Sequence, residues 1–558
     1  MKRSALQNLS RRVLSLVLAA ALLVPTAFAT AGDSQLSTAQ TLADGLVYRN
    51  TVSNHSSAGR EESFAFELSP DSPVYPIMIQ AAGTVYGAAT INRAIRTATE
   101  MGYHVVGGIN SDFFSPGTGV PNGIAIEEGV YKSSPEGNAA LAMVDGQLQL
   151  ITDPQVTITV TNQRTGVSAS LTHLNKSRLV SGGLYLYNED FSTVSTHTVN
   201  SSGRMIRMEL SGDSRGEDLT VNSSLELTVT EVFESVDDVT IGQDNYLLTA
   251  SFVSGFAELF AGYQPGDTVT ITTSCSDPDL SQAQWAGGCG DILVSGGAIA
   301  DSSGWSYATG RAPRTAVGVK SDGTMLFYTV DGRQSGYSGG LTEMDLAQEM
   351  LRQGCVWAVN LDGGGSTTFG VRLPGGSGIT VANSPSDGGL RSCAAFILLV
   401  TDPQTADGTP ERLALLNDGL VVLAGTSVSL GDAAALDAGM DTVSSRVTDA
   451  VFTSEKGLGT LNGGVYTAGS TPGTDTISLY SPSLDVSGTA QVHVVSTLSD
   501  LTVTRSGSSA SLSSLTVENG ESVSLTATGT YWSRAALRSG AGGVTWSVSG
   551  GVGAITQD

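Results

Sequence analysis

Two short segments each place an asparagine and an aspartate two residues apart, directly after an apolar run. The first pair is Asn110 and Asp112, and the second is Asn360 and Asp362. Residues two apart in an extended strand face the same side, and strand ends often carry functional loops. Carboxylates at such ends suit acid–base work on a glycosidic bond. We therefore expect the two pairs to lie close together, on neighbouring strands of one sheet system.

A run of three glycines, Gly363 to Gly365, follows Asp362 and precedes Ser366. Glycines leave the backbone N–H groups unobstructed, and the hydroxyl adds a donor, so the run suits a phosphate or a sugar close to the backbone. A tight turn without function is the alternative. No Gly-Lys-Ser/Thr follows, so the run is not a nucleotide-binding P-loop.

Two arginines, Arg311 and Arg314, stand at the base of an apolar hairpin whose outgoing strand ends at Asp331. Arg333 follows two residues later. A guanidinium can hold an oxyanion with two hydrogen bonds. Arg314 can equally pair with Asp331 or Asp362 as part of the structure.

Helices are predicted before both Asn-x-Asp segments. The first has apolar residues at helical spacing from Ile91 to Ala98 and stops at Gly102, and the second has Thr342 as N-cap and stops at Gly354. Short strands between Gly/Ser turns follow residue 403. We therefore expect an α+β fold, a mixed β-sheet catalytic domain with a few helices, followed by all-β immunoglobulin-like sandwich modules.

The chain divides into several expected units. These are a signal peptide (1–29), a catalytic domain (45–403), a β-rich insertion within it (151–250), an immunoglobulin-like sandwich (408–496) and an incomplete second module (497–558).

Residues 1–29 combine a basic start, an apolar stretch of twelve residues and a small-x-small site ending at Ala29, which predicts export with cleavage near Ala29. The mature chain is then secreted or held at the cell surface. No later stretch reaches the roughly 20 residues of a membrane span. The formal charge of −25 argues against nucleic acid and anionic membranes as partners.

The four cysteines of an exported chain predict two disulfides. We expect the pairs Cys275–Cys289 and Cys355–Cys393, with buried free thiols as the alternative. The five histidines are scattered, so no metal site is expected.

Several segments together resemble one known family, the phosphodiester glycosidases. They are GGINSDFF (107–114), RAPRTAVGV (311–319), VNLDGGGSTTF (359–369) and ANSPSDGGLR (382–391), and they occur in family order. The resemblance implies hydrolysis of a sugar-1-phosphodiester that releases the sugar and leaves a phosphomonoester. Ser111 stands where the family often has a glycine, which leaves the sugar open.

The motifs and this resemblance give a set of expected site residues and no cofactor. The expected catalytic residues are Asp112, Asp331 and Asp362. The expected substrate-binding residues are Asn110, Arg311, Arg314, Arg333, Asn360, Gly363, Gly364, Gly365, Ser366, Asp387 and Arg391.

The expected function is hydrolysis of an N-acetylglucosamine-1-phosphodiester-like linkage on a cell-wall or extracellular glycan. The C-terminal modules would attach to a cell-wall polymer. Two alternatives belong to other classes. One is a metal-dependent phosphodiesterase with Asp331 and Asp362 as ligands, and the other is a non-catalytic carbohydrate-binding or adhesion protein.

Overall fold

The computed structural model describes residues 33–55, 59–177, 183–196, 203–236, 238–252, 255–306, 309–517, 520–547 and 554–556. The expected signal peptide, residues 1–29, lies outside the described residues. Among the described residues, no helix is long and apolar enough to cross a membrane.

The predicted α+β class is wrong. Strands hold 46% of the residues and helices 8%, so the fold is mostly β. Both helical signals in the sequence were real, but each gives a helix of only ten residues. Elsewhere the many turn-forming glycines and the Thr/Val-rich alternation favour strands, and most of the chain pairs into sheets.

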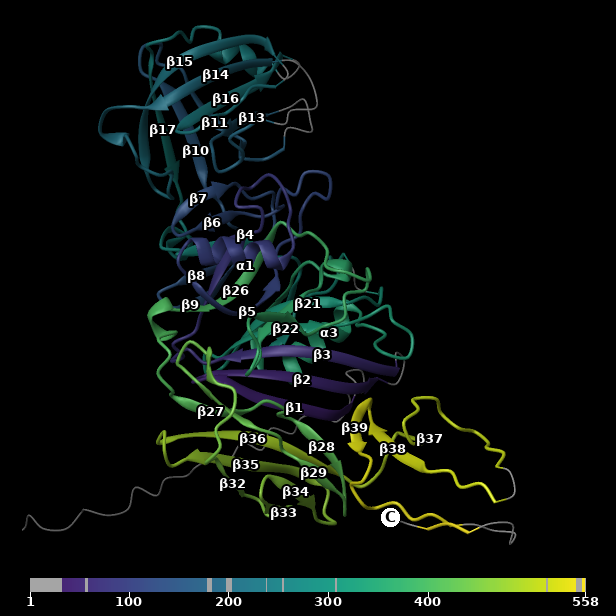
Figure 1. The fold of residues 1–558 in the computed structure, drawn as a ribbon. Helices are drawn as coiled ribbons and strands as arrows, with labels where there is room; N and C mark the ends of the chain where they lie inside the picture. Colours follow the sequence, from purple (N-terminus) through teal and green to yellow (C-terminus); the bar gives the residue numbers. More distant parts are fainter. Residues whose placement is uncertain are drawn as a thin grey trace, which may run out of the picture.

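Two antiparallel sheets form the centre of the molecule (Figure 1). The first, which we call sheet A, has in spatial order the strands β1 (Asp33–Ala43), β2 (Leu46–His55), β3 (Gly59–Leu68), β22 (Met325–Val330), β21 (Arg314–Lys320), β23 (Cys355–Asn360), β19 (Ile292–Ser295) and β20 (Ala298–Ile299). The second, sheet B, has β25 (Ile379–Val381), β24 (Phe369–Arg372), β5 (His104–Asn110), β26 (Ala395–Thr401) and β4 (Tyr75–Gln80).

A shared hydrophobic core joins sheets A and B. Phe66 of β3 stacks on Phe369 of β24 with ring centroids 4.3 Å apart, and Ile109 and Val359 are fully buried beside them. Burial of this apolar surface drives the two sheets together. Strand ends from both sheets can therefore meet at one edge of the core.

Each of the two sheets is covered on its outer face by one helix. Helix α1 (Ile91–Glu100) packs on sheet B, and α3 (Glu343–Arg352) packs on sheet A. Thr342 caps α3, as predicted, and forms a reciprocal capping box with Asp345. Gly102 and Gly354, at φ +98° and +92°, follow the helices, as predicted.

A third sheet and a larger one lie beyond sheet B, on the side away from sheet A (Figure 1). The third has β7 (Val130–Ser133), β6 (Ala125–Glu127), β18 (Trp285–Gly288), β8 (Ala140–Val144) and β9 (Gln147–Ile151), with the one-turn helix α2 (Pro278–Ser281) beside it. The large one, sheet F, has β11 (Ser168–Leu171), β10 (Thr157–Asn162), β17 (Thr268–Ser274), β15 (Ser224–Val236), β14 (Gly203–Leu210), β16 (Asn245–Ser251), β13 (Leu184–Tyr187) and β12 (His173–Leu174).

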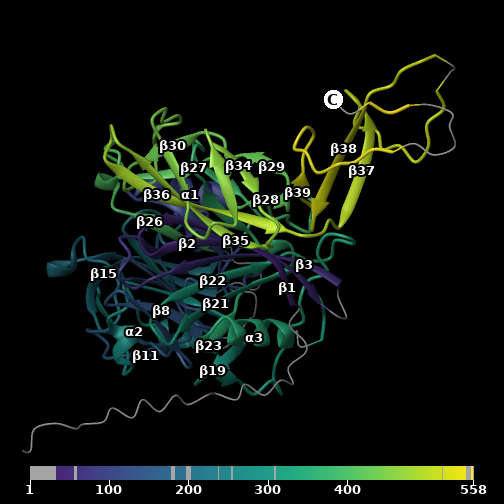
Figure 2. The same ribbon diagram turned by 90° about the horizontal axis from the view of Figure 1, so that it is seen from below.

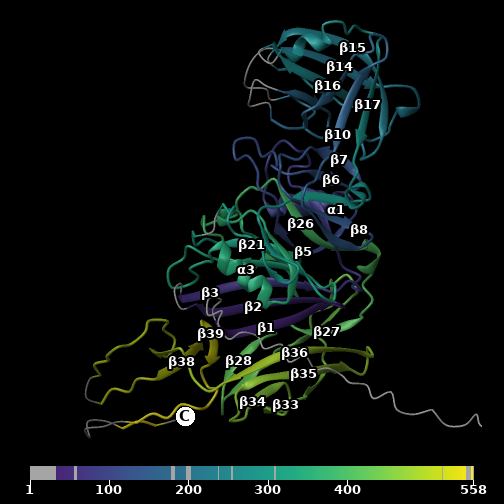
Figure 3. The same ribbon diagram turned by 180° about the vertical axis from the view of Figure 1, so that it is seen from behind.

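Sheet F forms one end of an elongated molecule (Figures 1 and 3). Two 3-10 turns, η1 (Gly212–Ser214) and η3 (Phe256–Phe260), belong to it. It runs from 157 to 274, further along the chain than the insertion expected at 151–250. The domain boundaries of the sequence analysis stay a prediction.

The tail after η5 (Pro403–Thr405) forms the opposite end. Its strands are β27 (Arg412–Leu415), β28 (Leu420–Leu423), β29 (Ser427–Ser429), β30 (Ala433–Leu436), β31 (Thr442–Ser444), β32 (Val451–Ser454), β33 (Gly459–Asn462), β34 (Val465–Ala468), β35 (Gly473–Ser481), β36 (Val486–Val495), β37 (Asp500–Arg505), β38 (Leu525–Tyr531) and β39 (Arg534–Leu537). One core, including Leu415, Tyr466 and Val492, unites the strands from β27 to β36 apart from β31. The pair β37–β38 projects beyond this core (Figure 2). The immunoglobulin-like assignment stays a prediction.

Gly107→Ala tests the contact between the two central sheets. A Cβ at Gly107 would lie 2.6 Å from Cζ of Phe66 and 3.2 Å from the carbonyl oxygen of Gly370. Because the Phe66 ring is already stacked, it has little room to move, and we expect a loss of about 1–3 kcal/mol in the free energy of unfolding. Gly117→Ala is the control, since its added Cβ meets nothing within 4 Å. Equal urea midpoints for the two variants would contradict this view of the core.

Candidate active site

The two Asn-x-Asp segments meet where sheets A and B join. The Asn110 side-chain amide donates to the carbonyl oxygen of Asp362 at 2.6 Å, and the Asp362 backbone N–H donates to the carbonyl oxygen of Ser111 at 3.1 Å. The predicted proximity is therefore confirmed. The strands are not neighbours in one sheet, because β5 belongs to sheet B and β23 to sheet A.

The side chain of Asn110 is fully buried and engaged within the protein. Its oxygen accepts hydrogen bonds from the Thr315 hydroxyl at 2.9 Å and from the Thr368 N–H at 3.0 Å. Together with the bond to Asp362, these contacts connect three separate chain segments. Asn110 thus holds the site together, which differs from the substrate contact expected from the sequence.

Asp362 is the most accessible of the three aspartates expected to be catalytic. It is partly exposed, whereas Asp112 and Asp331 are 2% and 0% exposed. Burial raises the pKa of Asp362 to about 6, against the lowering effects of the Ser366 hydroxyl, the Arg391 charge and the Gly363 N–H. A carboxyl that titrates near neutral pH and reaches the surface can exchange a proton with a bound substrate.

The glycine run after Asp362 folds into a 3-10 turn, η4 (Gly364–Ser366), against two guanidinium groups. A Cβ at Gly364 would lie 3.2 Å from Nη1 of Arg333, and one at Gly365 would lie 2.2 Å from Nη2 of Arg391. Gly364 has φ +62°, and Arg333 itself has φ +60°. Only glycine allows both arginines to approach the run this closely.

Several N–H groups of the turn are already used. Those of Gly364, Ser366 and Thr367 donate to the carbonyl oxygens of Pro313, Gly363 and Gly364, respectively. An anion here would therefore depend mainly on the guanidinium groups. Arg391 also pairs with Asp387, with N and O 2.6 Å apart.

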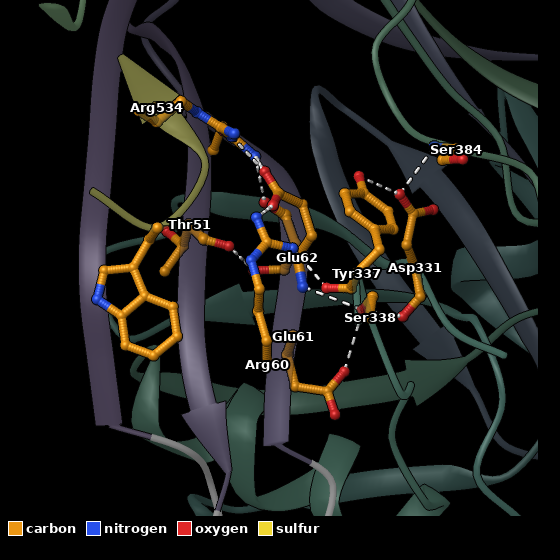
Figure 4. Close-up of polar contacts among 12 residues, drawn as sticks. Thr51, Arg60, Glu61, Glu62, Asp331, Tyr337, Ser338, Ser384 and Arg534 are labelled. Carbon is orange, nitrogen blue, oxygen red and sulfur yellow. Dashed lines mark hydrogen bonds and ion pairs between the residues drawn. The ribbon is translucent and has the colours of Figure 1, made fainter. Parts of the chain in front are cut away.

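Asp331 is enclosed by three donors, of which Figure 4 shows two, those of Tyr337 and Ser384. Its carboxylate accepts hydrogen bonds from the Ser384 N–H at 2.7 Å, the Asn383 amide at 3.0 Å and the Tyr337 hydroxyl at 3.0 Å. Burial raises the pKa of Asp331 to about 6 in spite of these bonds. Asp331 therefore fastens the segment after β22 to the segment after β25.

Asp112 lies near a buried lysine, Lys176, which no sequence motif indicated. Its carboxylate accepts a hydrogen bond from the Gly123 N–H at 2.7 Å, while Lys176, 1% exposed, donates to the carbonyl oxygens of Pro121 at 2.5 Å and Gly123 at 2.9 Å. Burial raises the pKa of Asp112 to about 7 and lowers that of Lys176 to about 8. Both side chains therefore bind the backbone of the loop 121–123.

The remaining predicted residues support the backbone. Arg314 is buried and donates to the carbonyl oxygens of Leu341 and Gly310, and Arg311 forms an ion pair of 3.1 Å with Asp345. These contacts attach the start of β21 to the start of α3. Asn360 is buried, and its carbonyl oxygen accepts the Gly290 N–H at 2.8 Å.

Two adjacent buried acids, Glu61 and Glu62 in β3, were missed by the sequence analysis. Glu61 accepts hydrogen bonds from the Gly340 N–H at 2.8 Å and the Ser338 hydroxyl at 3.2 Å. Neighbouring acids in a strand point to opposite faces, so a charged pair ordinarily indicates an exposed edge. The arginines at positions 60 and 534, which make burial of Glu62 tolerable, are not recognisable from spacing.

The two predicted disulfides are absent, because all four cysteines are free thiols. Cys355 packs in the core under α3, whereas Cys393 packs in the core under α1, so the second pair lies in separate cores. Cys289 is buried at the end of β18, and Cys275 lies at the partly exposed end of β17. The alternative of free thiols is the one that holds.

A cavity of about 740 Å³ adjoins the strand ends. Phe113, which follows Asp112, lines it together with Asn122, Asn138, Asp291 and Trp305. A second cavity, of about 870 Å³, lies apart from the site, beside β4 and Trp285. Among the described residues, no three His, Cys, Asp or Glu side chains are grouped as metal ligands would be.

Comparison with known proteins supports the family resemblance. Residues 223–400 match the family model for phosphodiester glycosidases. The resemblance to this family is thus confirmed for the segment with Arg314, Asp331, Asp362 and Arg391, and it supports a hydrolase of this class.

Individual relatives are similar over limited lengths. An uncharacterized SPbeta prophage-derived protein of Bacillus subtilis (strain 168), YomE, is 45% identical over 67 residues, 12% of this chain and 10% of that protein. A hypothetical protein from Synechocystis aligns with a TM-score of 0.51 and 19% identity, over 64% of this chain and 62% of that one. The catalytic domain of zebrafish N-acetylglucosamine-1-phosphodiester alpha-N-acetylglucosaminidase aligns with a TM-score of 0.32 and 13% identity, over 65% and 87%. The chain thus spans less than two thirds of the length of the Bacillus subtilis protein and of the Synechocystis protein.

Glu61→Gln tests the burial of charge behind the site. Burial raises the pKa of Glu61 from 4.5 to about 7, opposed by Gly340, Ser338 and Arg311 and aided by Asp345. Because the folded-state pKa lies above the unfolded one, the stabilisation is complete below about pH 4.5 and is lost as pH rises through about 7. The neutral variant lacks this loss, so its stability relative to wild type should improve between pH 5 and 8 in urea titrations. The exposed Glu209→Gln should show no such trend, and a parallel pH dependence of wild type and Glu61→Gln would contradict the assignment.

Proposed function

We propose that this protein is an exported phosphodiester glycosidase that hydrolyses a sugar-1-phosphodiester on a cell-wall or other extracellular glycan. The bond between the anomeric carbon and the phosphate oxygen breaks, water supplies the new hydroxyl of the sugar, and a phosphomonoester leaves. The observation that carries the proposal is the accessible carboxyl of Asp362, with its pKa near 6, directly before a glycine turn flanked by Arg333 and Arg391.

The two arginines suit the phosphate. Guanidinium groups remain charged and match the geometry of a phosphate group, so Arg333 and Arg391 would hold the phosphate of the bound diester. Ser366, hydrogen-bonded between Arg391 and Asp362, lies between this phosphate position and the carboxylate.

Asp362 would act in its ionised form. A phosphomonoester leaving group has a second pKa near 6, so it needs little help from a general acid. The demanding step is attack at the anomeric carbon, for which a carboxylate serves as nucleophile or as base towards water. Asp112 and Asp331, which are buried and hydrogen-bonded, would maintain the shape of the site.

The cavity beside Phe113 and Trp305 would accept the sugar. Sugars commonly present an apolar face and several hydroxyl groups, which an aromatic ring together with amide and carboxylate side chains can bind. Asn122, Asn138 and Asp291 supply such polar groups in this cavity. Which sugar is bound depends on how these residues meet its substituents.

Export and attachment complete the proposal. Residues 1–29 would direct export, with cleavage near Ala29, and the β-rich tail after residue 408 would bind a cell-wall polymer. Membrane fractionation and binding of the purified full chain to isolated cell walls would test these two statements.

Asp362→Asn should reduce kcat/KM for a soluble sugar-1-phosphodiester at least ~100-fold. The amide keeps the shape of the side chain but cannot act as nucleophile or base. In the wild type kcat/KM should rise with pH through about 6, where Asp362 ionises. Asp322→Asn, in the exposed turn of the β21–β22 hairpin, is the matched control. A folded Asp362→Asn protein with near-normal turnover would refute the role of Asp362.

Tryptophan fluorescence tests the sugar cavity without relying on catalysis. N-acetylglucosamine, used as the probe, should change the emission of the wild type but not that of Trp305→Phe, because the other tryptophans lie outside this cavity. No change in the wild type would contradict the assignment of the cavity. A change without any hydrolysis by the wild type would instead support the non-catalytic carbohydrate-binding alternative.

A further inference from the structure

A buried glutamate on β3 forms ion pairs with two arginines, and one of these arginines lies near the C-terminal end of the chain. Glu62, 2% exposed, pairs through one carboxylate oxygen with Arg60 and through the other with Arg534 of β39. The Asn50 amide also donates to Glu62 at 2.9 Å, and Arg534 donates to Asn50. Burying a carboxylate is unfavourable unless its charge is balanced, so both arginines matter to this strand.

The hairpin that presents Arg534 has an unusual turn. Trp532 and Ser533 connect β38 to β39 with φ +47° and +69°, the left-handed region that two-residue hairpin loops require and that glycine or asparagine usually fills. The Tyr531 hydroxyl donates to the carbonyl oxygen of Gln35 at 3.3 Å, and Trp532 packs in a cluster with Leu36 of β1. The tail hairpin is therefore docked on sheet A by specific contacts.

The same stretch of β3 is bonded residue by residue to the loop 331–340. The N–H groups of Asp331 and Gly339 donate to the carbonyl oxygens of Glu62 and Arg60 at 2.9 and 3.2 Å. Arg60 also donates to the carbonyl oxygen of Tyr337 and lies over its ring, with 5.1 Å from Cζ to the ring centroid. Arg60 thus pairs with Glu62 and binds Tyr337 of the loop at the same time.

The loop 331–340 carries two groups of the candidate active site. Asp331 begins it, and Arg333 lies against Gly364 in the turn that follows Asp362. The chain of contacts therefore runs from Arg534 through Glu62 and Arg60 to Tyr337, and from there to the arginine proposed to bind phosphate.

We propose that Arg534 is a positioning residue for this site, acting through Glu62 and Arg60 on the loop 331–340. While Arg534 balances one carboxylate oxygen of Glu62, Arg60 can divide its donors between Glu62 and Tyr337. Without Arg534, Glu62 draws the whole guanidinium of Arg60, and the loop loses the hydrogen bond from Arg60 to Tyr337, while its bonds to Glu61 remain. The kinetic part of this inference rests on the proposed function, and the structural part does not.

Hydrogen exchange of the full-length protein tests the structural part. In Arg534→Ala, the amides of Asp331, Gly339 and Gly340, which bond to β3, should exchange about 2- to 30-fold faster than in the wild type, the range that corresponds to coupling energies between connected sites. Arg538→Ala is the matched control, because Arg538 of the same tail donates to the carbonyl oxygen of Val421 and not to Glu62. Unchanged exchange at all three amides would overturn the proposal.

Two further variants make the test specific to charge. Adding Glu62→Gln to Arg534→Ala removes the unbalanced charge and should restore slow exchange of the loop amides. Arg534→Gln keeps a donor but no charge and gives the same readout if Arg534→Ala does not fold. Fast exchange that persists in the double variant would show mere undocking of the tail and would overturn the proposal.

The kinetic readout separates this inference from the proposed function. With a soluble sugar-1-phosphodiester, Arg534→Ala should raise KM about 2- to 30-fold and change kcat little, because Arg333 holds the phosphate in the bound substrate. A lowered kcat with unchanged KM would contradict the path through Arg333. Absence of hydrolysis by the wild type would refute the proposed function, while the exchange result would still decide the role of Arg534.

Discussion

The site depends on one buried amide. Asn110, at the end of a strand of sheet B, bonds to Asp362 and Thr368 in the connection between β23 and β24 and to Thr315 in β21 of sheet A. Polar groups enclosed by two hydrophobic layers must find partners within the protein. This amide finds them on two other segments at once and so fixes where the partly exposed carboxylate of Asp362 stands relative to the glycine turn.

Burial divides the acids of the site into two kinds. Asp331 and Asp112 are closed to solvent, and donors reach both oxygens of Asp331 but only Oδ2 of Asp112, whereas Asp362 is partly exposed. All three have raised pKa values with burial as the main cause. A shifted pKa alone would not separate them, and the difference in access is what assigns the proposed chemistry to Asp362.

Local signals in the sequence were sufficient for local structure. The capping residues of α3, the glycines after both helices and the convergence of the two Asn-x-Asp segments could be predicted from spacing. The fold class could not be predicted, because two short helices with clear end signals are conspicuous in the sequence but make up little of a molecule built mainly of strands. The predicted disulfide pairs were wrong because an even number of cysteines does not indicate in which hydrophobic core each thiol is buried.

The charged side chains that come to the site from distant parts of the chain could not be predicted from the sequence either. Lys176 is bonded to the loop beside Asp112, and Arg534 is bonded to Glu62, although hundreds of residues separate Arg534 from its partner. Nothing in the composition of β3 indicates that its glutamates are buried. Their environment is set by segments whose approach is a property of the tertiary structure.

The position of Lys176 bears on how such a chain can be rearranged in evolution. Sheet F forms one end of the molecule (Figure 3) and shares a hydrophobic core with the third sheet, and the segment after its strand β12 supplies the ammonium group that binds the loop 121–123. A recombination event that excised this unit at its visible boundaries would also strip a buried carboxylate of its neighbouring cation. The unit and the site are therefore expected to be inherited together, and an exchange of one requires compensating change in the other.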